Sequence, residues 1–172
     1  MKKEEGTAIG TILSKEQSDY FKGYINRLTE TMRLRDWNIT IDFTKVPSDG
    51  AYAENSQFGH SKHSELRFAE VFLQLTPTQQ TQVILHELVH CYLFEVHTCS
   101  IDGFSCVGGA KASYVFEASI TAQVELATDA IADVLTPLVE QFALPATEFF
   151  ELPVATTSWD SNKVLVVNAN NM

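Results

Sequence analysis

The stretch 82–94 constrains the fold of this chain more than any other part of the sequence. Nearly all of its side chains are apolar, and they surround a His-Glu-Leu-Val-His motif at positions 86–90. Two residues that are four apart in a helix lie on the same face, one turn from each other. The stretch therefore predicts a helix buried at the centre of the protein, with His86 and His90 pointing to the same side.

The motif at 86–90 has the spacing of a metal site. His86 and His90 can bind one ion through their ring nitrogens, and Glu87 lies about 100° further round the helix axis. A zinc ion with an open coordination position lowers the pKa of its bound water to around 7, and a neighbouring carboxylate can accept the proton. We therefore expect Zn2+ on His86 and His90, with Glu87 as general base. The alternative is a core helix whose histidines hydrogen-bond to their neighbours.

The third metal ligand is expected from the long apolar-striped helix that follows in the sequence, because a catalytic zinc site usually has three protein ligands. Glu125 and Asp129 are four residues apart in a strip that is otherwise apolar, where carboxylates need partners. We expect Glu125 to bind the metal and Asp129 to accept a hydrogen bond from the far nitrogen of His86. Glu117 is the alternative ligand, and Asp133 is expected to face the solvent. A solvated acidic face is the alternative interpretation of these carboxylates.

The remaining pattern predicts an α+β fold. It has an N-terminal helix, a short and mostly antiparallel sheet, the metal-binding helix and a long C-terminal helix that carries the third ligand. Ser14 and Thr76 are expected as N-caps, with Pro77 at the first position of the central helix. The expected elements are a helix over 14–34, strands over 36–43, 51–59 and 66–75, the central helix over 77–96, a loop over 97–109 and a helix over 112–142.

Composition limits the classes of partner. With 172 residues, 45% of them hydrophobic, the chain is expected to form one domain over 1–172, with a core at 14–142 and a tail at 143–172. Its net charge of −10 makes nucleic acid an unlikely partner. The sequence shows no secretory signal and no apolar run of membrane-spanning length, so a cytoplasmic location is expected.

The three cysteines are expected to be reduced thiols, which agrees with a cytoplasmic location. Cys99 and Cys106 lie near His97 and could form a second metal cluster with it. Their spacing differs from that of the usual structural zinc sites, however. Ordinary thiols are therefore the expectation for both.

Taken together, these motifs resemble the zincin metallopeptidases. The motif at 86–90 followed by Glu125-x-x-x-Asp129 is similar to the gluzincin pattern of thermolysin-like enzymes, and the run 84–94 is also similar to SprT-like and Spartan-type proteases. The metzincin pattern is not met, because Leu93 and Val96 stand where Gly and His would be. The resemblance covers roughly 36–135. It implies a minimal zincin-like fold of the small type that phages and bacteria often encode.

The resemblance implies a cytosolic zinc metallopeptidase, here an endopeptidase, that acts on a protein or peptide. Glu87 would take a proton from water and pass it to the leaving amine. The predicted strand 66–75 would be the sheet edge that holds an extended peptide. The candidates for an oxyanion donor are Tyr52, His60, His63 and Tyr114.

Two other functions stay open at the level of sequence. One is a non-catalytic zinc-binding regulatory or host-interaction protein on the same fold, because a fold does not determine a function. The other is a protease associated with nucleic acid, which would bind DNA in a salt-dependent way.

Overall fold

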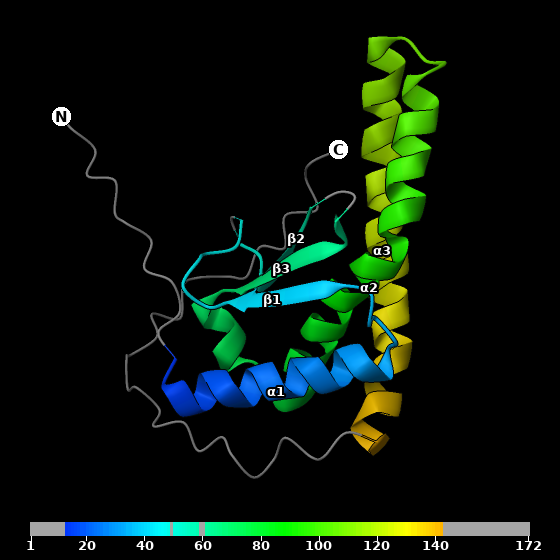
Figure 1. The fold of residues 1–172 in the computed structure, drawn as a ribbon. Helices are drawn as coiled ribbons and strands as arrows, with labels where there is room; N and C mark the ends of the chain where they lie inside the picture. The colour runs from blue at the N-terminus through cyan, green and yellow to red at the C-terminus, as the bar shows by residue number, and fades with distance from the viewer. Residues whose placement is uncertain (1–12, 49, 59–60, 143–172) are drawn as a thin grey trace, which may run out of the picture.

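A small sheet, one helix laid across it and a long helical hairpin make up the structure, a computed structural model that describes residues 13–48, 50–58 and 61–142 (Figure 1). This arrangement confirms the α+β prediction. The tail expected at 143–172 lies outside the described residues. In chain order the elements are α1 (Lys15–Thr31), β1 (Asn38–Asp42), β2 (Ala53–Phe58), β3 (His63–Phe68), the 3-10 helix η2 (Glu70–Gln74), α2 (Pro77–Ser105) and α3 (Ala110–Phe142).

The sheet is mixed rather than mostly antiparallel. Its strand order is β1-β3-β2, with β3 parallel to β1 and antiparallel to β2. The strand predicted over 66–75 is wrong in its second half, because β3 ends at Phe68 and η2 begins at Glu70. A shift in the two-residue apolar period between Phe68 and Val71 marks this break. Since β3 is the central strand, it cannot be the sheet edge that we expected to hold a peptide.

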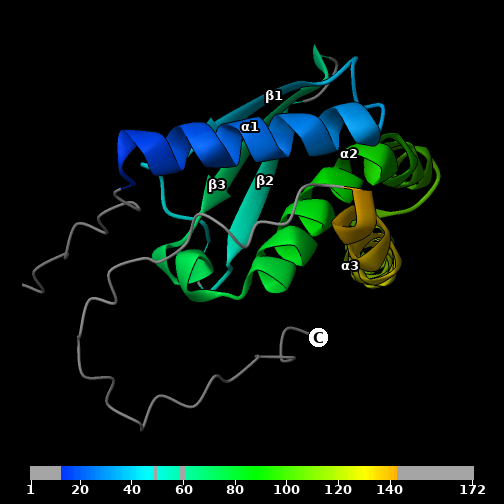
Figure 2. The same ribbon diagram turned by 90° about the horizontal axis from the view of Figure 1, so that it is seen from below.

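The two faces of the sheet differ in polarity. One face packs against α1 and the first half of α2, as Figure 2 shows, and it buries Leu66 and Phe68 completely or nearly so. The opposite face carries ion pairs, including one of 2.6 Å between Arg67 Nε and Glu65 Oε1. A sheet that buries one face and solvates the other leaves an edge strand accessible beside the helices.

Both N-terminal caps form as the sequence predicted. The Ser14 side chain accepts from the Gln17 backbone N–H, and the Gln17 side chain accepts from the Ser14 backbone N–H. Thr76 and Gln79 make the same reciprocal pair at the start of α2, with Pro77 at the first helical position. Such caps satisfy N–H groups that have no partner inside the helix, so the start of α2, and with it the 86–90 motif, is fixed locally.

The hairpin of α2 and α3 is longer than predicted. The expected loop over 97–109 is wrong, because α2 continues to Ser105. Contacts with α3 hold this extension: His97 Nε2 lies 3.1 Å from Thr121 Oγ1, and the rings of Phe104 and Phe116 stack 4.2 Å apart. Packing between two helices outweighs the low helix propensity of the Gly, Ser and Cys residues in this stretch.

The turn between the two helices closes at Gly108. Its N–H donates to the Phe104 carbonyl over 2.8 Å, and a Cβ atom here would lie 2.7 Å from the Phe104 ring. Beyond the turn, α3 runs as one helix through Pro137. None of the helices described is both long enough and apolar enough to cross a membrane.

Candidate metal centre

His86 and His90 lie side by side on α2, where the hairpin leaves the sheet. Their Nε2 atoms are 3.1 Å apart, and both side chains are mostly buried. Ile84, Leu85 and Leu88 turn away from this face and are fully buried in the core. The apolar side of α2 thus anchors the helix, and both imidazoles face α3.

Glu125 reaches the two histidines from α3. Its Oε2 lies 3.4 Å from His86 Nε2, and its Oε1 lies 3.6 Å from His90 Nε2. His86, His90 and Glu125 therefore form a group between α2 and α3 that could hold a metal ion. Across residues 13–142, apart from the gaps given above, this is the one such group of His, Cys, Asp and Glu side chains.

The spacing of the three donor groups fits a single ion. A tetrahedral ion with ligand bonds of about 2.0–2.1 Å holds its donor atoms about 3.3 Å from each other. The nitrogen–nitrogen and nitrogen–oxygen distances here are 3.1, 3.4 and 3.6 Å. The donors can therefore receive an ion with little rearrangement, and two imidazoles with one carboxylate are a donor set that divalent transition metals accept.

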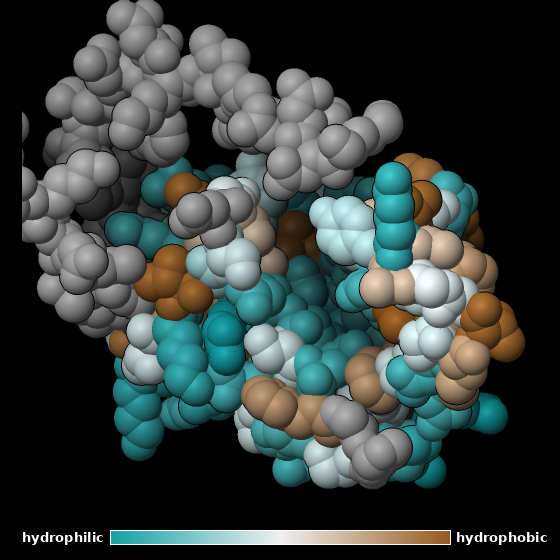
Figure 3. All heavy atoms as spheres, turned by 90° about the horizontal axis from the view of Figure 1, so that it is seen from above, coloured by the Kyte–Doolittle hydropathy of each residue, from teal (hydrophilic) through white to brown (hydrophobic). Residues whose placement is uncertain are grey.

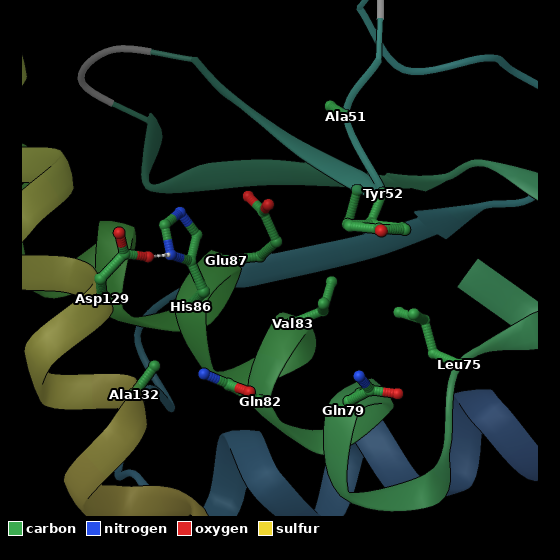
Figure 4. A pocket seen from close by; sticks show the side chains of 11 residues that line it. Ala51, Tyr52, Leu75, Gln79, Gln82, Val83, His86, Glu87, Asp129 and Ala132 are labelled. Carbon is green, nitrogen blue, oxygen red and sulfur yellow. Dashed lines mark hydrogen bonds and ion pairs between the residues drawn. The ribbon is translucent and has the colours of Figure 1, made fainter. Parts of the chain in front are cut away.

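Asp129 lies one turn along α3 from Glu125 and contacts the other side of the His86 ring. Its Oδ1 is 2.8 Å from His86 Nδ1, as the dashed line in Figure 4 shows. A carboxylate in this position makes Nδ1 the protonated nitrogen and leaves the lone pair of Nε2 for a metal.

The surroundings hold two of the three members of the triad, His90 and Glu125, in the form that binds a metal ion. Burial lowers the pKa of His90, so its imidazole is neutral near pH 7. The hydrogen bond to His86 lowers the pKa of Glu125, which is therefore a carboxylate. Burial also lowers the pKa of His86, but the contact with Glu125 and the charges of Glu87 and Asp129 outweigh this and raise it.

Glu87 is buried beside the triad without joining it. Only 7% of the residue is exposed, and burial raises the pKa of its carboxyl to about 7. In Figure 4 this carboxyl points from α2 toward the sheet, into open space next to the His86 ring. A carboxyl with a pKa near neutrality can both accept and release a proton at that pH.

Asn55, on β2, is a residue of the site that the sequence analysis missed. Its Nδ2 donates to the Glu87 carbonyl oxygen over 2.6 Å, and its Oδ1 accepts from Ser64 Oγ over 2.6 Å. The bond to the Glu87 carbonyl links β2, an edge strand of the sheet, to α2 at the 86–90 motif. The sequence feature that could have pointed to Asn55 is the two-residue period of a strand, which places it on the same face as Ala53 and Gln57.

Polar pairs continue along the hairpin on both sides of the triad. Gln82 Nε2 donates to Asp133 Oδ1 over 2.5 Å, one turn before the His86–Asp129 pair. Asp133 is exposed, as the sequence predicted, and its bond to Gln82 helps to fix how α2 and α3 are aligned along each other. On the other side of the triad, His97 pairs with Thr121. Polar contacts before, at and after the triad thus fix the alignment of the antiparallel helices α2 and α3.

Two cavities of about 400 Å3 each lie on either side of Glu87. We call them the first cavity, shown in Figure 4, and the second cavity. They share Ala51, Ala53, His86 and Glu87, so together they form one groove with β2 on one wall, α2 as floor and α3 on the other wall. Figure 3 shows a hollow lined mainly by hydrophilic side chains on the face seen from above.

The other candidates from the sequence are dispersed. Tyr52 lines the first cavity, whereas Tyr114 is exposed far along the hairpin. His63 packs against the Phe58 ring at 5.4 Å between centroids, and position 60 lies outside the described residues. The thiols of Cys99 and Cys106 are free and exposed, and Glu117 is exposed. Of the three oxyanion candidates that the structure describes, Tyr52 is therefore the one that lies at the groove.

No protein-family model matches this chain, and neither does any curated protein or solved structure that was compared with it. The interpretation of the site therefore depends on its own geometry.

Proposed function

We propose that this protein is a zinc-dependent metallopeptidase that cleaves peptide bonds. The observation that carries the proposal is the convergence of His86, His90 and Glu125 beside a buried Glu87 that is not part of the triad. A purely structural metal site needs no base of this kind. The proposal adds a reaction to the metal-binding group described above.

Zinc is the proposed ion because two imidazoles and one carboxylate are a common donor set of catalytic zinc sites. When bound, zinc lowers the pKa of a coordinated water and polarises a carbonyl group. Asp129 orients the His86 ring, which would leave the Nε2 lone pair available to the ion.

Glu87 is proposed as the group that moves the proton. Its buried carboxyl accepts a proton from the attacking water and then gives it to the leaving amine. Its pKa of about 7 suits both steps near neutral pH, and the approach of a cation would lower this value toward the charged form. The hydrogen bond from Asn55 to the Glu87 carbonyl oxygen fixes the position of the Glu87 backbone relative to β2.

The substrate is proposed to be an extended peptide lying along β2. This strand is the edge of the sheet next to α2, so its outer side can pair with a peptide backbone. The groove has room on both sides of Glu87, and no Lys or Arg among the described residues lines either cavity to pair with a terminal carboxylate. Both features favour an endopeptidase over a carboxypeptidase.

A second candidate is a non-catalytic zinc-binding protein that binds a partner. The observation that favours it is the exposure of large apolar side chains along the distal part of the hairpin, among them Val107, Tyr114 and Val115. Apolar residues gathered on an exposed surface often mark an interaction site.

Glu87→Gln separates the two candidates. The variant should keep one zinc per chain but lose cleavage of a mixture of unfolded proteins, followed by mass spectrometry, by at least about a hundredfold. Glu117→Gln, an exposed carboxylate on α3, is the matched control and should cleave as wild type does. If wild type with one bound zinc cleaves nothing, or cleaves no faster than Glu87→Gln, the peptidase proposal is wrong.

A further inference from the structure

The two cavities differ in the side chains that line their inner parts. In the first cavity the buried or half-buried wall is formed by Tyr52, Leu75, Val83 and Ala132. Its polar residues outside the site, Gln79 and Gln82, are exposed. Figure 4 shows Val83 pointing from α2 toward Tyr52 beside Glu87. The inner part of this cavity therefore suits an apolar side chain of moderate size.

The second cavity is polar in its inner part. It is lined by Asn55 and Gln57 from β2, by His97 from α2 and by Thr121 from α3. Most of these groups already have partners: Asn55 bonds to the Glu87 carbonyl and Ser64, and His97 bonds to Thr121. A ligand in this cavity thus meets few hydrogen-bonding groups that are free.

Gln57 is the exception. Its Nε2 is buried and makes no hydrogen bond to any nitrogen or oxygen atom that the structure describes. Its remaining contact is with the Cys91 thiol: burial raises the pKa of this thiol, and weak hydrogen bonds from Asn55, Ser64 and Gln57 act in the opposite direction. A buried amide donor whose only partner is a weakly accepting sulfur is poorly satisfied, and a ligand that supplies an oxygen acceptor removes this cost.

The charges around Gln57 restrict that acceptor. The carboxylates of Glu54 and Glu125 line the same cavity, and no Lys or Arg among the described residues does. The Glu54 carboxylate accepts hydrogen bonds from both the N–H and the hydroxyl of Ser48. An acidic side chain would therefore meet repulsion, whereas an uncharged amide or hydroxyl oxygen would not.

We propose that the groove selects peptides with an uncharged, hydrogen-bond-accepting side chain in the second cavity and an apolar side chain in the first. Gln57 is the specificity-determining residue of the second cavity, and Val83 contributes to the first. This inference rests on the proposed function for its choice of an extended peptide as ligand. It adds the class of side chain that each half of the groove accepts.

A binding experiment tests the selection without requiring cleavage. Zinc-loaded Glu87→Gln protein is incubated with a synthetic hexapeptide library, and the retained peptides are identified by mass spectrometry. We expect Asn, Gln, Ser or Thr to be enriched about two- to tenfold over Asp and Glu at one position, close to an enriched Ala, Val or Leu. Equal retention of all peptides would overturn the inference.

Two further variants, each added to Glu87→Gln, assign the preference to its residue. Gln57→Glu keeps the shape but exchanges the donor for a carboxylate, so enrichment should move to Lys and Arg; Gln57→Leu should abolish the polar preference. Val83→Thr should weaken only the apolar preference. All variants should keep one zinc per chain, which shows that the triad is intact. Unchanged peptide preferences in both Gln57 variants would overturn the role of Gln57.

Cleavage by zinc-loaded wild type distinguishes failure of this inference from failure of the proposed function. Selective retention with no hydrolysis of the retained peptides would support the groove assignment and contradict the peptidase proposal. Hydrolysis without any side-chain preference would do the reverse.

Discussion

The α2–α3 hairpin has two halves with the same helical geometry and different surroundings. The half that lies against the sheet, at 77–91 and 128–139, contains every buried residue of the two helices for which burial is described. In the projecting half, at 92–127, no residue is buried. The first half meets the sheet and the partner helix. The second meets mainly the partner helix (Figure 1), apart from Phe94, whose ring lies 5.7 Å from that of Trp37, and Glu95, which pairs with Lys62. Helical structure therefore persists here with one main neighbour, whereas a buried core forms where the sheet and the partner helix both pack.

The group that could hold a metal ion lies at the boundary between these halves. His86 and His90 come from a segment fixed by the core, and Glu125 comes from the projecting half, where its side chain is half exposed. The groove opens at this boundary because the hairpin leaves the sheet there. Packing of α2 in the core thus positions His86 and His90, and the alignment of α3 along α2 positions Glu125.

The largest expected difference between the halves is in stability. Leu88→Ala removes a side chain that is 0% exposed and should lower the free energy of unfolding by about 2–5 kcal/mol. Val96→Ala changes a residue that is 60% exposed and should change it by about 0.5 kcal/mol or less. Urea unfolding of both variants measures this. Equal losses would show that the projecting half is packed as tightly as the base.

The next effect is a pH dependence that Glu87 gives to the metal-free protein. Burial raises its pKa to about 7, so the folded state holds a proton that the unfolded state releases above about pH 4.5. Its contribution to stability is complete below that pH and is lost as the pH rises through about 7, by up to about 3 kcal/mol.

The variant Glu87→Gln should not show this loss. With metal chelated, its stability relative to wild type should therefore increase between pH 5 and pH 8. Both proteins contain the two histidines, so the difference between them reports the Glu87 carboxyl together with its charge interaction with His86. A constant difference across this range would mean that the Glu87 carboxyl titrates as if it were in water.

A smaller effect is expected on metal affinity at the boundary. Asp129→Asn should weaken zinc binding about 10- to 100-fold, because a neutral amide replaces the charged acceptor that orients the His86 ring and makes it a stronger ligand. Asp133→Asn, one turn further along α3 and bonded to Gln82 instead, is the matched control and should bind zinc as wild type does. Competition with a chromophoric chelator gives both affinities, and equal weakening would assign the effect to general charge.

The smallest effect is expected at the far end of the hairpin. Gly108→Ala brings a Cβ atom against the Phe104 ring and should cost about 1 kcal/mol of stability, since the ring must move within its stack with Phe116. Zinc affinity should not change, because the turn is remote from the triad. A loss of affinity would show that the projecting half holds Glu125 in place through the turn.

The sequence predicted the elements whose signals are local. The caps at Ser14 and Thr76, the central helix and the long second helix all follow from periodicity and turn chemistry. The spacing of the 86–90 motif and of Glu125 and Asp129 also predicted which donors lie together, because both pairs are one helical turn apart.

Features that depend on tertiary packing were not predictable from the sequence. The strand order, which makes β3 central and β2 the edge, depends on pairings between distant segments. The helical form of 97–105 depends on α3, which supplies Thr121 and Phe116 as partners. Asn55 and Gln57 were missed for the same reason, since only the fold brings their strand to the motif.

The turn at Gly108 also explains the long sequence interval between the second and third donors. Fifteen residues of α2 follow His90, and fifteen residues of α3 precede Glu125. The two segments are equal in length and antiparallel, so they bring Glu125 back beside His90. The number of residues between His90 and Glu125 therefore depends on how far the hairpin projects, and not on the size of the site. Any natural or engineered protein with this geometry could shorten or extend the hairpin in matched steps on both helices and still close the same coordination sphere.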